Sequence, residues 1–370
     1  METLTPIMQF GTSRFLQAHA DLFISEARLA GQDVGPISVV QSSGDAARAG
    51  RLQALAVPFP VKIEGLENGV RVEKTVEVGS IARGLSTSND WADVRRLFVE
   101  EVQIVLSNTG DAGYAPQPED ERQTFDQAMS YPAKLTLLLR ARFEAGAVPI
   151  QIMPMELISG NGEVLKARVM ELAKNDSHAF LDYLATGVTW VNSLVDRIVS
   201  QPIEPAGAVA EPYALWAIED QSGLRVPCIH PAVKVVPALA EIEALKLFVL
   251  NLGHTVLADR WLTAGGAATV MVRDLMETPS EREHLQSIYT NEVRPGFAAA
   301  GQGAAFDDYV STTLERFANP FLGHAIADIA QNHAMKVERR IEAFLSFARI
   351  QSDTSAKPIL EHICARQKGA

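Results

Sequence analysis

PIMQFGTSRFLQAH, residues 6–19, is the stretch that decides the predicted fold. An apolar strand, a glycine and the start of a helix follow one another here without a gap. This order is typical of dinucleotide-binding folds, in which backbone N–H groups of the turn meet a pyrophosphate at the helix N-terminus. The usual fingerprint is G-x-G-x-x-G, but only Gly11 is present, and Ser13 stands where the second glycine would be. An ordinary strand-to-helix turn is therefore an equal alternative on this stretch alone.

Strand and helix signals alternate over the first half of the chain. Apolar runs and helical spacing predict strands at 6–11, 36–43, 102–110 and 148–156 and helices at 15–31, 91–100 and 132–146. An Asn68-Gly69 pair inside the alternating stretch 59–79 predicts a β-hairpin. Strands that alternate with helices favour a mostly parallel sheet covered on both faces, which is an α/β domain.

The character of the chain changes after about residue 235. Strand signals nearly vanish, and helical segments are predicted at 236–263, 280–291, 306–317, 322–349 and 356–367. A chain of 370 residues also exceeds the usual size of one hydrophobic core. We therefore expect an α/β domain over residues 1–235 and an all-α domain over 236–370, joined near the two prolines of 228–237.

Composition narrows the class of protein. Lys and Arg total 33 and Asp and Glu total 45, a formal charge of −12, which argues against a nucleic-acid binder but leaves small acidic substrates open. No run is long enough to span a membrane, and no signal peptide is apparent. The two cysteines suit a reducing compartment, so we expect a cytoplasmic protein, either monomer or homodimer.

KLFVLNLGHT, residues 246–255, interrupts an apolar helix with three polar groups. At the α-helical period, Asn251 lies about 140° from Lys246, and His254 lies about 80° from it, between the two. A lysine whose pKa is lowered by burial is a competent general base, and the neighbouring amide and imidazole can polarise a carbonyl or hydroxyl. Glu243, on the same side, could relay protons. A partly exposed helix with a solvated lysine and a core histidine is the alternative.

The K-x-x-x-x-N-x-x-H spacing resembles the hallmark of the long-chain mannitol dehydrogenase family of polyol and uronate oxidoreductases. Four more stretches resemble that family in order: FGTSRFLQAHADLF (10–23), VTWVNSLVDRIV (188–199), EPYALWAIED (211–220) and RFANPFLGHAIADIAQNHAMK (316–336). The resemblance spans nearly the whole chain.

The tagaturonate reductase (altronate oxidoreductase) branch looks nearest within this family. VLSNTGDAGY (105–114) and MELISGNGEVLK (155–166) are similar to stretches of that branch. The polyol branch has an arginine where this chain has Asp328, so an arginine contact is not carried over. The chain is also shorter than typical uronate reductases, which leaves the shape of the substrate pocket open.

The resemblance implies a Rossmann-type N-terminal domain, a helical C-terminal domain and reversible hydride transfer between a nicotinamide and a sugar carbon, with no metal. Lys246 would be the acid/base, and Asn192, Asn251 and His254 would hold the substrate oxygen. Lys336 would contact a sugar acid or its hydroxyls. Asp220, at the end of a predicted strand, and Glu243 are further candidate substrate residues.

Candidate cofactor contacts come from the glycine turn and from the ends of two predicted strands. They are Gly11, Thr12, Ser13, Arg14, Phe15, Gln41 and Asn108. The second strand ends in Gln41 rather than in an acid that would hold a ribose, and Asp45 and Arg48 follow. NAD is the expected cofactor, and NADP is not excluded.

Two other functions stay open. A polyol dehydrogenase of the mannitol type would share the same acid/base chemistry. A non-catalytic, dinucleotide-binding redox sensor would explain the incomplete glycine turn and the missing acid. A structural role is expected for several other residues. His19 and Trp216 are interpreted as packing residues, and His324 and His333 as surface or interface residues. Cys228 and His230 are too few to form a metal site.

Overall fold

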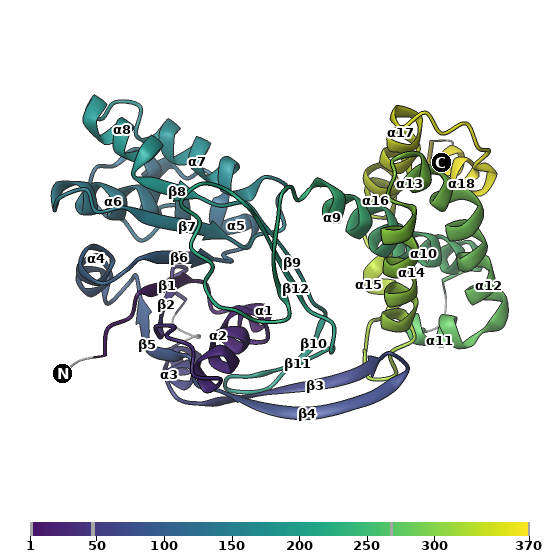
Figure 1. Cartoon of the computed structure of the whole chain (residues 1–370), viewed down its shortest axis with the longest axis horizontal. Coiled ribbons are helices and arrows are strands. Elements are labelled where there is room, and N and C mark those ends of the chain that lie inside the picture. The colour runs from purple at the N-terminus through teal and green to yellow at the C-terminus, as the bar shows by residue number, and fades with distance from the viewer. Residues whose placement is uncertain (1–2, 46–48, 267–268, 369–370) are drawn as a thin grey trace. The chain divides into compact units, whose positions relative to one another are not determined.

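The computed structural model describes residues 3–45, 49–266 and 269–368 (Figure 1). Arg48 lies outside these ranges. The chain divides into two compact units, one formed by Met1–Ile63 and Glu73–Leu239, the other by Glu64–Val72 and Ala240–Ala370. The second unit therefore takes in a short piece of the N-terminal half, in addition to the C-terminal helices.

A six-stranded parallel sheet is the centre of the first unit, as the alternating sequence predicts. Its order is β5-β2-β1-β6-β7-β8, which is the Rossmann order with a switch point between β1 and β6. The strands are β1 (Ile7–Phe10), β2 (Ile37–Gln41), β5 (Ile81–Ser86), β6 (Ile104–Ser107), β7 (Ile150–Pro154) and β8 (Val188–Trp190).

Helices cover this sheet because its strands are apolar on both faces. On one face Met8 and Phe10 share a core with Leu97 of α4 (Trp91–Glu100) and Leu138 of α6 (Tyr131–Glu144). On the other, Gln9 of β1 contacts α2 through Asp21. The helices are α1 (Arg14–Gln17), α2 (Ala20–Leu29), α3 (Ala49–Leu55), α4 (Trp91–Glu100), α5 (Asp111–Tyr114), η2 (Pro118–Glu121), α6 (Tyr131–Glu144), α7 (Asn161–Leu172) and α8 (His178–Thr186).

Two smaller sheets complete the first unit, and the sequence analysis did not anticipate them as sheets. One has the order β10-β11-β3-β4 and the other β13-β12-β9. Their strands are β3 (Phe59–Glu67), β4 (Val70–Val78), β9 (Ser193–Asp196), β10 (Val199–Pro202), β11 (Ala208–Ala210), β12 (Leu215–Glu219) and β13 (Val233–Val236). Trp216 in β12 is fully buried, as expected for a core residue.

The predicted hairpin is β3–β4, drawn as two long curved strands in Figure 1. Asn68 and Gly69 at its turn have φ angles of 54° and 75°, the pair of positive values that a type I′ turn requires. The tip of the hairpin, residues 64–72, belongs to the second unit. There the Gly69 N–H donates to the Glu315 carboxylate over 2.6 Å, and the Arg71 guanidinium lies 4.6 Å from the centre of the Phe321 ring.

The rest of the second unit is helical, as predicted, but the long helices are interrupted. Three π-helical turns break them within the described residues. Asn332, which has a left-handed conformation, precedes a new helix inside the predicted segment 322–349. The elements are α9 (Ala240–Leu245), η3 (Lys246–Asn251), α10 (Leu252–Thr263), α11 (Val272–Glu277), α12 (Pro279–Ile288), η4 (Tyr289–Val293), α13 (Arg294–Ala299), α14 (Gly303–Phe317), α15 (Ile326–Ala330), α16 (His333–Val337), η5 (Glu338–Glu342), α17 (Ala343–Ile350) and α18 (Pro358–Lys368). Within the described ranges, no helix combines the length and the apolar character needed to cross a membrane.

Candidate functional site

The glycine turn after β1 requires glycine for two physical reasons. Gly11 has a φ of 119°, a conformation that residues with a side chain rarely adopt. A Cβ atom at this position would lie only 2.5 Å from the carbonyl oxygen of Asn108. The turns that follow β1 and β6 therefore approach each other at backbone distance, at the switch point of the sheet.

Ser13 links the same two turns. Its hydroxyl accepts a hydrogen bond from the Leu16 N–H over 3.2 Å, which caps helix α1, and donates to the Asn108 side-chain oxygen, also over 3.2 Å. The Asn108 amide donates in turn to the Met155 carbonyl over 2.9 Å. The serine at the second glycine position thus forms two hydrogen bonds through its hydroxyl group, and a glycine there could not form them.

A cavity of about 350 Å³ opens at these turns, and most of the predicted cofactor residues line it. The lining includes Gly11, Thr12, Ser13, Gln41 and Asn108, together with Ser42, Ser43, Arg51, Thr109 and Gly110.

Two predicted cofactor residues point elsewhere. The Arg14 guanidinium forms an ion pair with Glu204 over 2.6 Å and donates to the Gly207 carbonyl over 3.0 Å. The Phe15 ring stacks on His19, with 4.8 Å between the ring centres. His19 is fully buried, and its Nε2 lies 2.9 Å from the Leu215 carbonyl oxygen, which makes it a packing residue.

A buried carboxyl group lies under the wall of this cavity, and the sequence analysis did not single it out. Glu156, which follows β7, accepts hydrogen bonds from the Ser107 hydroxyl and from the Thr109 N–H, both over 3.0 Å. Burial raises the pKa of its carboxyl group. Glu156 therefore holds the turn after β6 in place from below.

A buried lysine fixes the opposite wall. Lys134 of α6 donates to the carbonyl groups of Ser42 and Gln127, over 2.8 and 2.9 Å. Burial lowers the pKa of its amine to about 8. Glu156 and Lys134 each have a partner far away in the sequence, Ser107 and Ser42 respectively, which the residues next to them do not reveal.

Asn192 and Asp220 also belong to the first unit. The Asn192 amide donates to the Glu219 carboxylate over 2.7 Å, and its oxygen accepts from the Glu163 N–H over 3.2 Å. Asp220 is exposed at the end of β12. Glu219 therefore orients Asn192. The two residues are close because β9 and β12 are antiparallel, so that the start of β9 lies beside the end of β12.

The Lys–Asn–His stretch lies in the second unit, and Lys246 to Asn251 form the π-helical turn η3. Lys246 and Asn251 are half-buried, and His254, in the first turn of α10, is buried. Glu243 lies half-buried in the preceding helix α9. The three polar groups therefore sit at the junction of two helices rather than along one regular helix.

His254 is enclosed by aromatic and cationic side chains. Its ring lies 4.3 Å from that of Phe317 and 4.9 Å from that of His324, measured between ring centres. Burial lowers the pKa of His254 well below its usual value, and its interactions with His324 and with the positive charges of Arg316, Arg340 and Lys336 lower it further. His254 is consequently a neutral imidazole in a positively charged environment.

Two of these cations have backbone partners. Lys336 donates to the Ile329 carbonyl over 2.7 Å, and burial lowers the pKa of its amine. Arg340 of η5 donates to the Asn251 carbonyl over 3.3 Å and to the Thr255 hydroxyl over 3.1 Å. Asp328, which replaces the polyol-branch arginine, is exposed.

His324 and His333, predicted to lie at a surface or interface, are not among the exposed residues. His333 is buried, and its Nε2 lies 3.2 Å from the Asp259 carboxylate, because α16 packs against α10. His324 is half-buried against the edge of His254. His230 bonds to Glu26 over 2.8 Å. In the described ranges, no group of three or more potential metal ligands is found.

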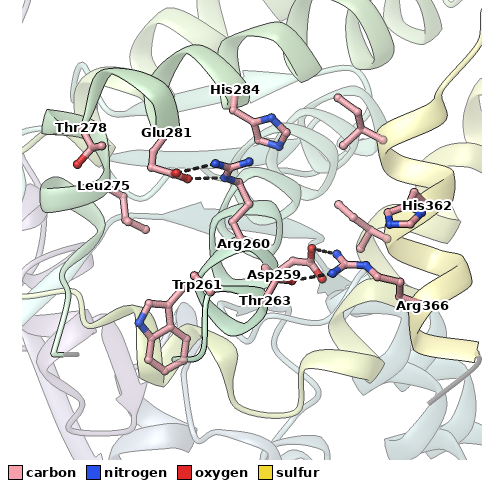
Figure 2. A pocket seen from close by; sticks show the side chains of 13 residues that line it. Asp259, Arg260, Trp261, Thr263, Leu275, Thr278, Glu281, His284, His362 and Arg366 are labelled. Carbon is pink, nitrogen blue, oxygen red and sulfur yellow. Dashed lines mark hydrogen bonds and ion pairs between the residues drawn. The ribbon is translucent and has the colours of Figure 1, made fainter. Parts of the chain in front are cut away.

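A second cavity, of about 590 Å³, lies in the second unit (Figure 2). Arg260 pairs there with Glu281 over 2.6 Å, and Arg366 pairs with Asp259. In each pair the arginine and the carboxylate neutralise each other's charge. Among the described residues, its lining shares none with the predicted catalytic set, so we do not regard it as the candidate catalytic site.

The first unit has a parallel sheet in Rossmann order with a glycine turn at its switch point. The second unit is helical and contributes a lysine and a neutral histidine. This combination is typical of two-domain dehydrogenases. The chain belongs to the mannitol dehydrogenase family. Residues 5–227 match the mannitol dehydrogenase Rossmann domain, and residues 238–366 match the mannitol dehydrogenase C-terminal domain. The predicted family and fold class are thereby confirmed, and the protein is an oxidoreductase.

Relatives and solved structures agree with this assignment. The chain is 28% identical to the altronate oxidoreductase of Bacillus subtilis over 362 residues, which cover 90% of this chain and 73% of that protein. It is 26% identical to the uncharacterized oxidoreductase YeiQ of Escherichia coli, over 91% of this chain and 73% of that one.

The same fold is found in two solved dehydrogenases. A substrate-free D-sorbitol dehydrogenase superposes with a TM-score of 0.79 at 18% identity, over 93% of this chain and 76% of that one. Mannitol 2-dehydrogenase of Pseudomonas fluorescens, solved with NAD and D-mannitol, superposes with a TM-score of 0.75 at 17% identity, over 98% and 84%.

Proposed function

We propose that the protein interconverts a keto sugar acid of the tagaturonate or fructuronate type and its hydroxy acid, by hydride transfer with a nicotinamide cofactor. The names of its altronate oxidoreductase relatives support this substrate class. NAD is the proposed cofactor because the related mannitol 2-dehydrogenase was solved with NAD, and NADP stays an alternative.

The observation that carries the proposal is the positive charge around the neutral His254. Arg316, Arg340 and Lys336 all act on this buried imidazole. A carboxylate gains from such an environment, whereas an uncharged polyol does not.

We propose that the first cavity holds a dinucleotide. The turns after β1 and β6 line it with glycine backbone and with the hydroxyl side chains of Thr12, Ser13 and Thr109, which suit a phosphate group. Gly11, Thr12, Ser13, Gln41 and Asn108 are the proposed contacts. When bound, the nicotinamide ring accepts or supplies the hydride.

The second unit would supply the proton chemistry. Lys246 takes the hydroxyl proton during oxidation and returns it during reduction, and Glu243 relays it to solvent. Asn251 and the neutral His254 donate hydrogen bonds to the reacting oxygen, with Asn192 as a further contact. The His254 Nε2 atom suits this role, since it is buried and has no hydrogen-bond partner among the described residues.

Lys336 and Asp220 would select the rest of the substrate. Lys336 is the proposed contact for the carboxylate, and Asp220 for a hydroxyl group. Because the cations near His254 include Lys336, replacing this lysine by methionine should weaken the preference for acids over uncharged sugars.

A substrate panel tests the proposal. NADH and NADPH oxidation would be followed with tagaturonate, with fructuronate and with the uncharged ketose that matches each of them, all at equal concentrations. We expect kcat/KM for a keto acid to exceed that for the matched uncharged ketose by about 100-fold, roughly the gain from one charge-assisted pair. A preference for the uncharged ketose would identify a polyol dehydrogenase, and cofactor binding without turnover would identify a redox sensor.

The acid/base role has its own test. Lys246→Ala should lower kcat by about 100-fold or more, the range of general acid–base catalysis, while cofactor binding measured by calorimetry is retained. Lys234→Ala, at an exposed lysine of β13, is the matched control and should leave kcat unchanged. Wild-type kcat in Lys246→Ala would exclude the mechanism.

A further inference from the structure

The π-helical turn η3 explains the spacing between Lys246 and Asn251. In an α-helix, residues five positions apart lie about 140° from each other, on different sides. In a π-helical turn the hydrogen bonds run from residue i to residue i+5, so these two residues are one turn apart. The Leu252 N–H bonds to the Leu247 carbonyl in this way. The widened turn thus brings the lysine and the asparagine toward one face.

A π-helical turn disturbs the α-helical pattern of backbone hydrogen bonds and needs support from outside. Tyr289, from another helix, provides it. Its buried hydroxyl donates to the Val249 carbonyl, inside η3, over 2.8 Å. Tyr289 is almost completely buried, so water does not compete for this bond.

Gly253 makes room for the Tyr289 hydroxyl. A Cβ at Gly253 would lie 1.9 Å from the hydroxyl oxygen and 3.1 Å from the Phe317 ring. Phe317 is the ring that packs against His254. One missing side chain therefore admits both the tyrosine that holds the π-helical turn and the phenylalanine that orients the histidine.

We propose that Tyr289 is a positioning residue: its hydrogen bond to Val249, admitted by Gly253, holds η3 in the π-helical form that aligns Lys246 with Asn251 and His254. This inference rests on the proposed function of those three residues. Tyr289 itself does not touch the substrate. Its contribution is to the geometry of the groups that do.

The chain offers a matched control. Tyr183 in the first unit is also a largely buried tyrosine whose hydroxyl donates to a backbone carbonyl, that of Val148, over 3.1 Å. Tyr289→Phe and Tyr183→Phe therefore delete the same kind of hydrogen bond. Only the first deletion concerns the π-helical turn.

The first measurement does not depend on catalysis. Hydrogen–deuterium exchange of the full-length protein should show faster exchange over residues 247–254 in Tyr289→Phe and no change there in Tyr183→Phe. The second measurement is steady-state kinetics with the best substrate of the panel. Tyr289→Phe should lower kcat by about 10- to 100-fold, the effect of misplacing reactive groups by about 1 Å. The KM for the cofactor should be unchanged.

The pH profile separates positioning from stability. Because Lys246 would change its environment, the apparent pKa of kcat should shift in Tyr289→Phe and not in Tyr183→Phe. Gly253→Ala, whose new methyl group would displace the Tyr289 hydroxyl, should reproduce both the faster exchange over residues 247–254 and the shift of the apparent pKa of kcat. The inference is overturned if Tyr289→Phe lowers only the melting temperature, with exchange over η3, kcat and the pH profile all unchanged. If Lys246→Ala is fully active instead, the proposed function fails, while the exchange measurement still tests whether Tyr289 holds η3.

Discussion

Asp21 is a carboxyl group buried in helix α2, under the first strand of the sheet. Among the described residues, the only hydrogen bond to its carboxyl group is a long one of 3.5 Å from the Gln9 amide. Burial raises its pKa to about 8, and the bond from Gln9 opposes this shift only weakly. Asp21 is therefore protonated in the native protein at neutral pH.

Asp21→Asn should stabilise the protein at alkaline pH. An unfolded aspartate loses its proton near pH 4, but the native one keeps it until about pH 8. Between these values unfolding releases a proton, so the stability of the wild type falls as the pH rises and levels off above pH 8. Asparagine does not titrate. Urea unfolding should show a gain on the order of 2–5 kcal/mol at pH 9 and little gain at pH 4. An equal effect at both pH values would contradict the assigned protonation.

His254 should stay neutral over the range in which most histidines titrate. Its pKa is lowered by burial, by the neighbouring His324 and by the cations Arg316, Arg340 and Lys336. The unfolded histidine takes up a proton near pH 6.5 while the native one does not, so stability is lost as the pH falls below that value. NMR of the His254 imidazole Cε1–H should show no titration between pH 8 and pH 6. A midpoint at or above pH 6.5 would refute the neutral hydrogen-bond donor.

Residues that interact locally were the ones the sequence could identify. Gly11 has a conformation that glycine favours, and Ser13 caps the helix that begins beside it. Glu156 and Lys134 support the same cavity but were missed. Each is defined by burial against a strand or loop that is distant in the sequence, and burial of this kind has no signature in the neighbouring residues.

At the scale of single elements, the turn of hairpin β3–β4 depends on its two residues with positive φ. Gly69→Ala should destabilise the protein by about 1 kcal/mol, the cost of the left-handed conformation for a residue with a Cβ. A Cβ there would touch nothing within 4 Å, so no clash adds to this cost. Asn68→Gly, at the other position, should change stability far less. Thermal unfolding of both variants makes the comparison, and equal losses would argue against backbone conformation as the cause.

Apolar periodicity predicted where helices occur in the second unit but not where they break. The predicted helix 236–263 became α9, η3 and α10, preceded by the end of strand β13. A π-helical turn adds one residue to a helix without changing its apolar character. What stabilises it is a donor from elsewhere, here Tyr289, and the sequence of the helix itself does not show that partner.

Over the whole molecule, the alternation of strands and helices was enough to predict the parallel sheet and the helical C-terminal part. Beyond the predicted hairpin, the smaller sheets were missed because their other strands, β9 to β13, have only three to five residues and pair across large distances in the chain, as β11 does with β3. The sequence also did not indicate that the hairpin is shared. Its outer residues 64–72 belong to the second unit, and the remainder of both strands belongs to the first.

The shared hairpin should couple the unfolding of the two units. The contacts that hold its tip in the second unit include those of Gly69 with Glu315 and of Arg71 with Phe321. The Asn319 amide also donates to the Glu64 carbonyl over 3.3 Å. The double variant Arg71→Ala/Glu315→Ala removes two of them, with a combined loss of about 1–2 kcal/mol from one exposed cation–π contact and one hydrogen bond to a carboxylate.

Differential scanning calorimetry would measure this coupling. Because the tip contributes to the second unit only, the double variant should lower the midpoint of that unit's transition and separate it from the transition of the sheet. Lys74→Ala, at an exposed position of β4 in the first unit, should leave the profile unchanged. If the double variant instead shifts both transitions equally, or shifts neither, the hairpin is not what couples the units.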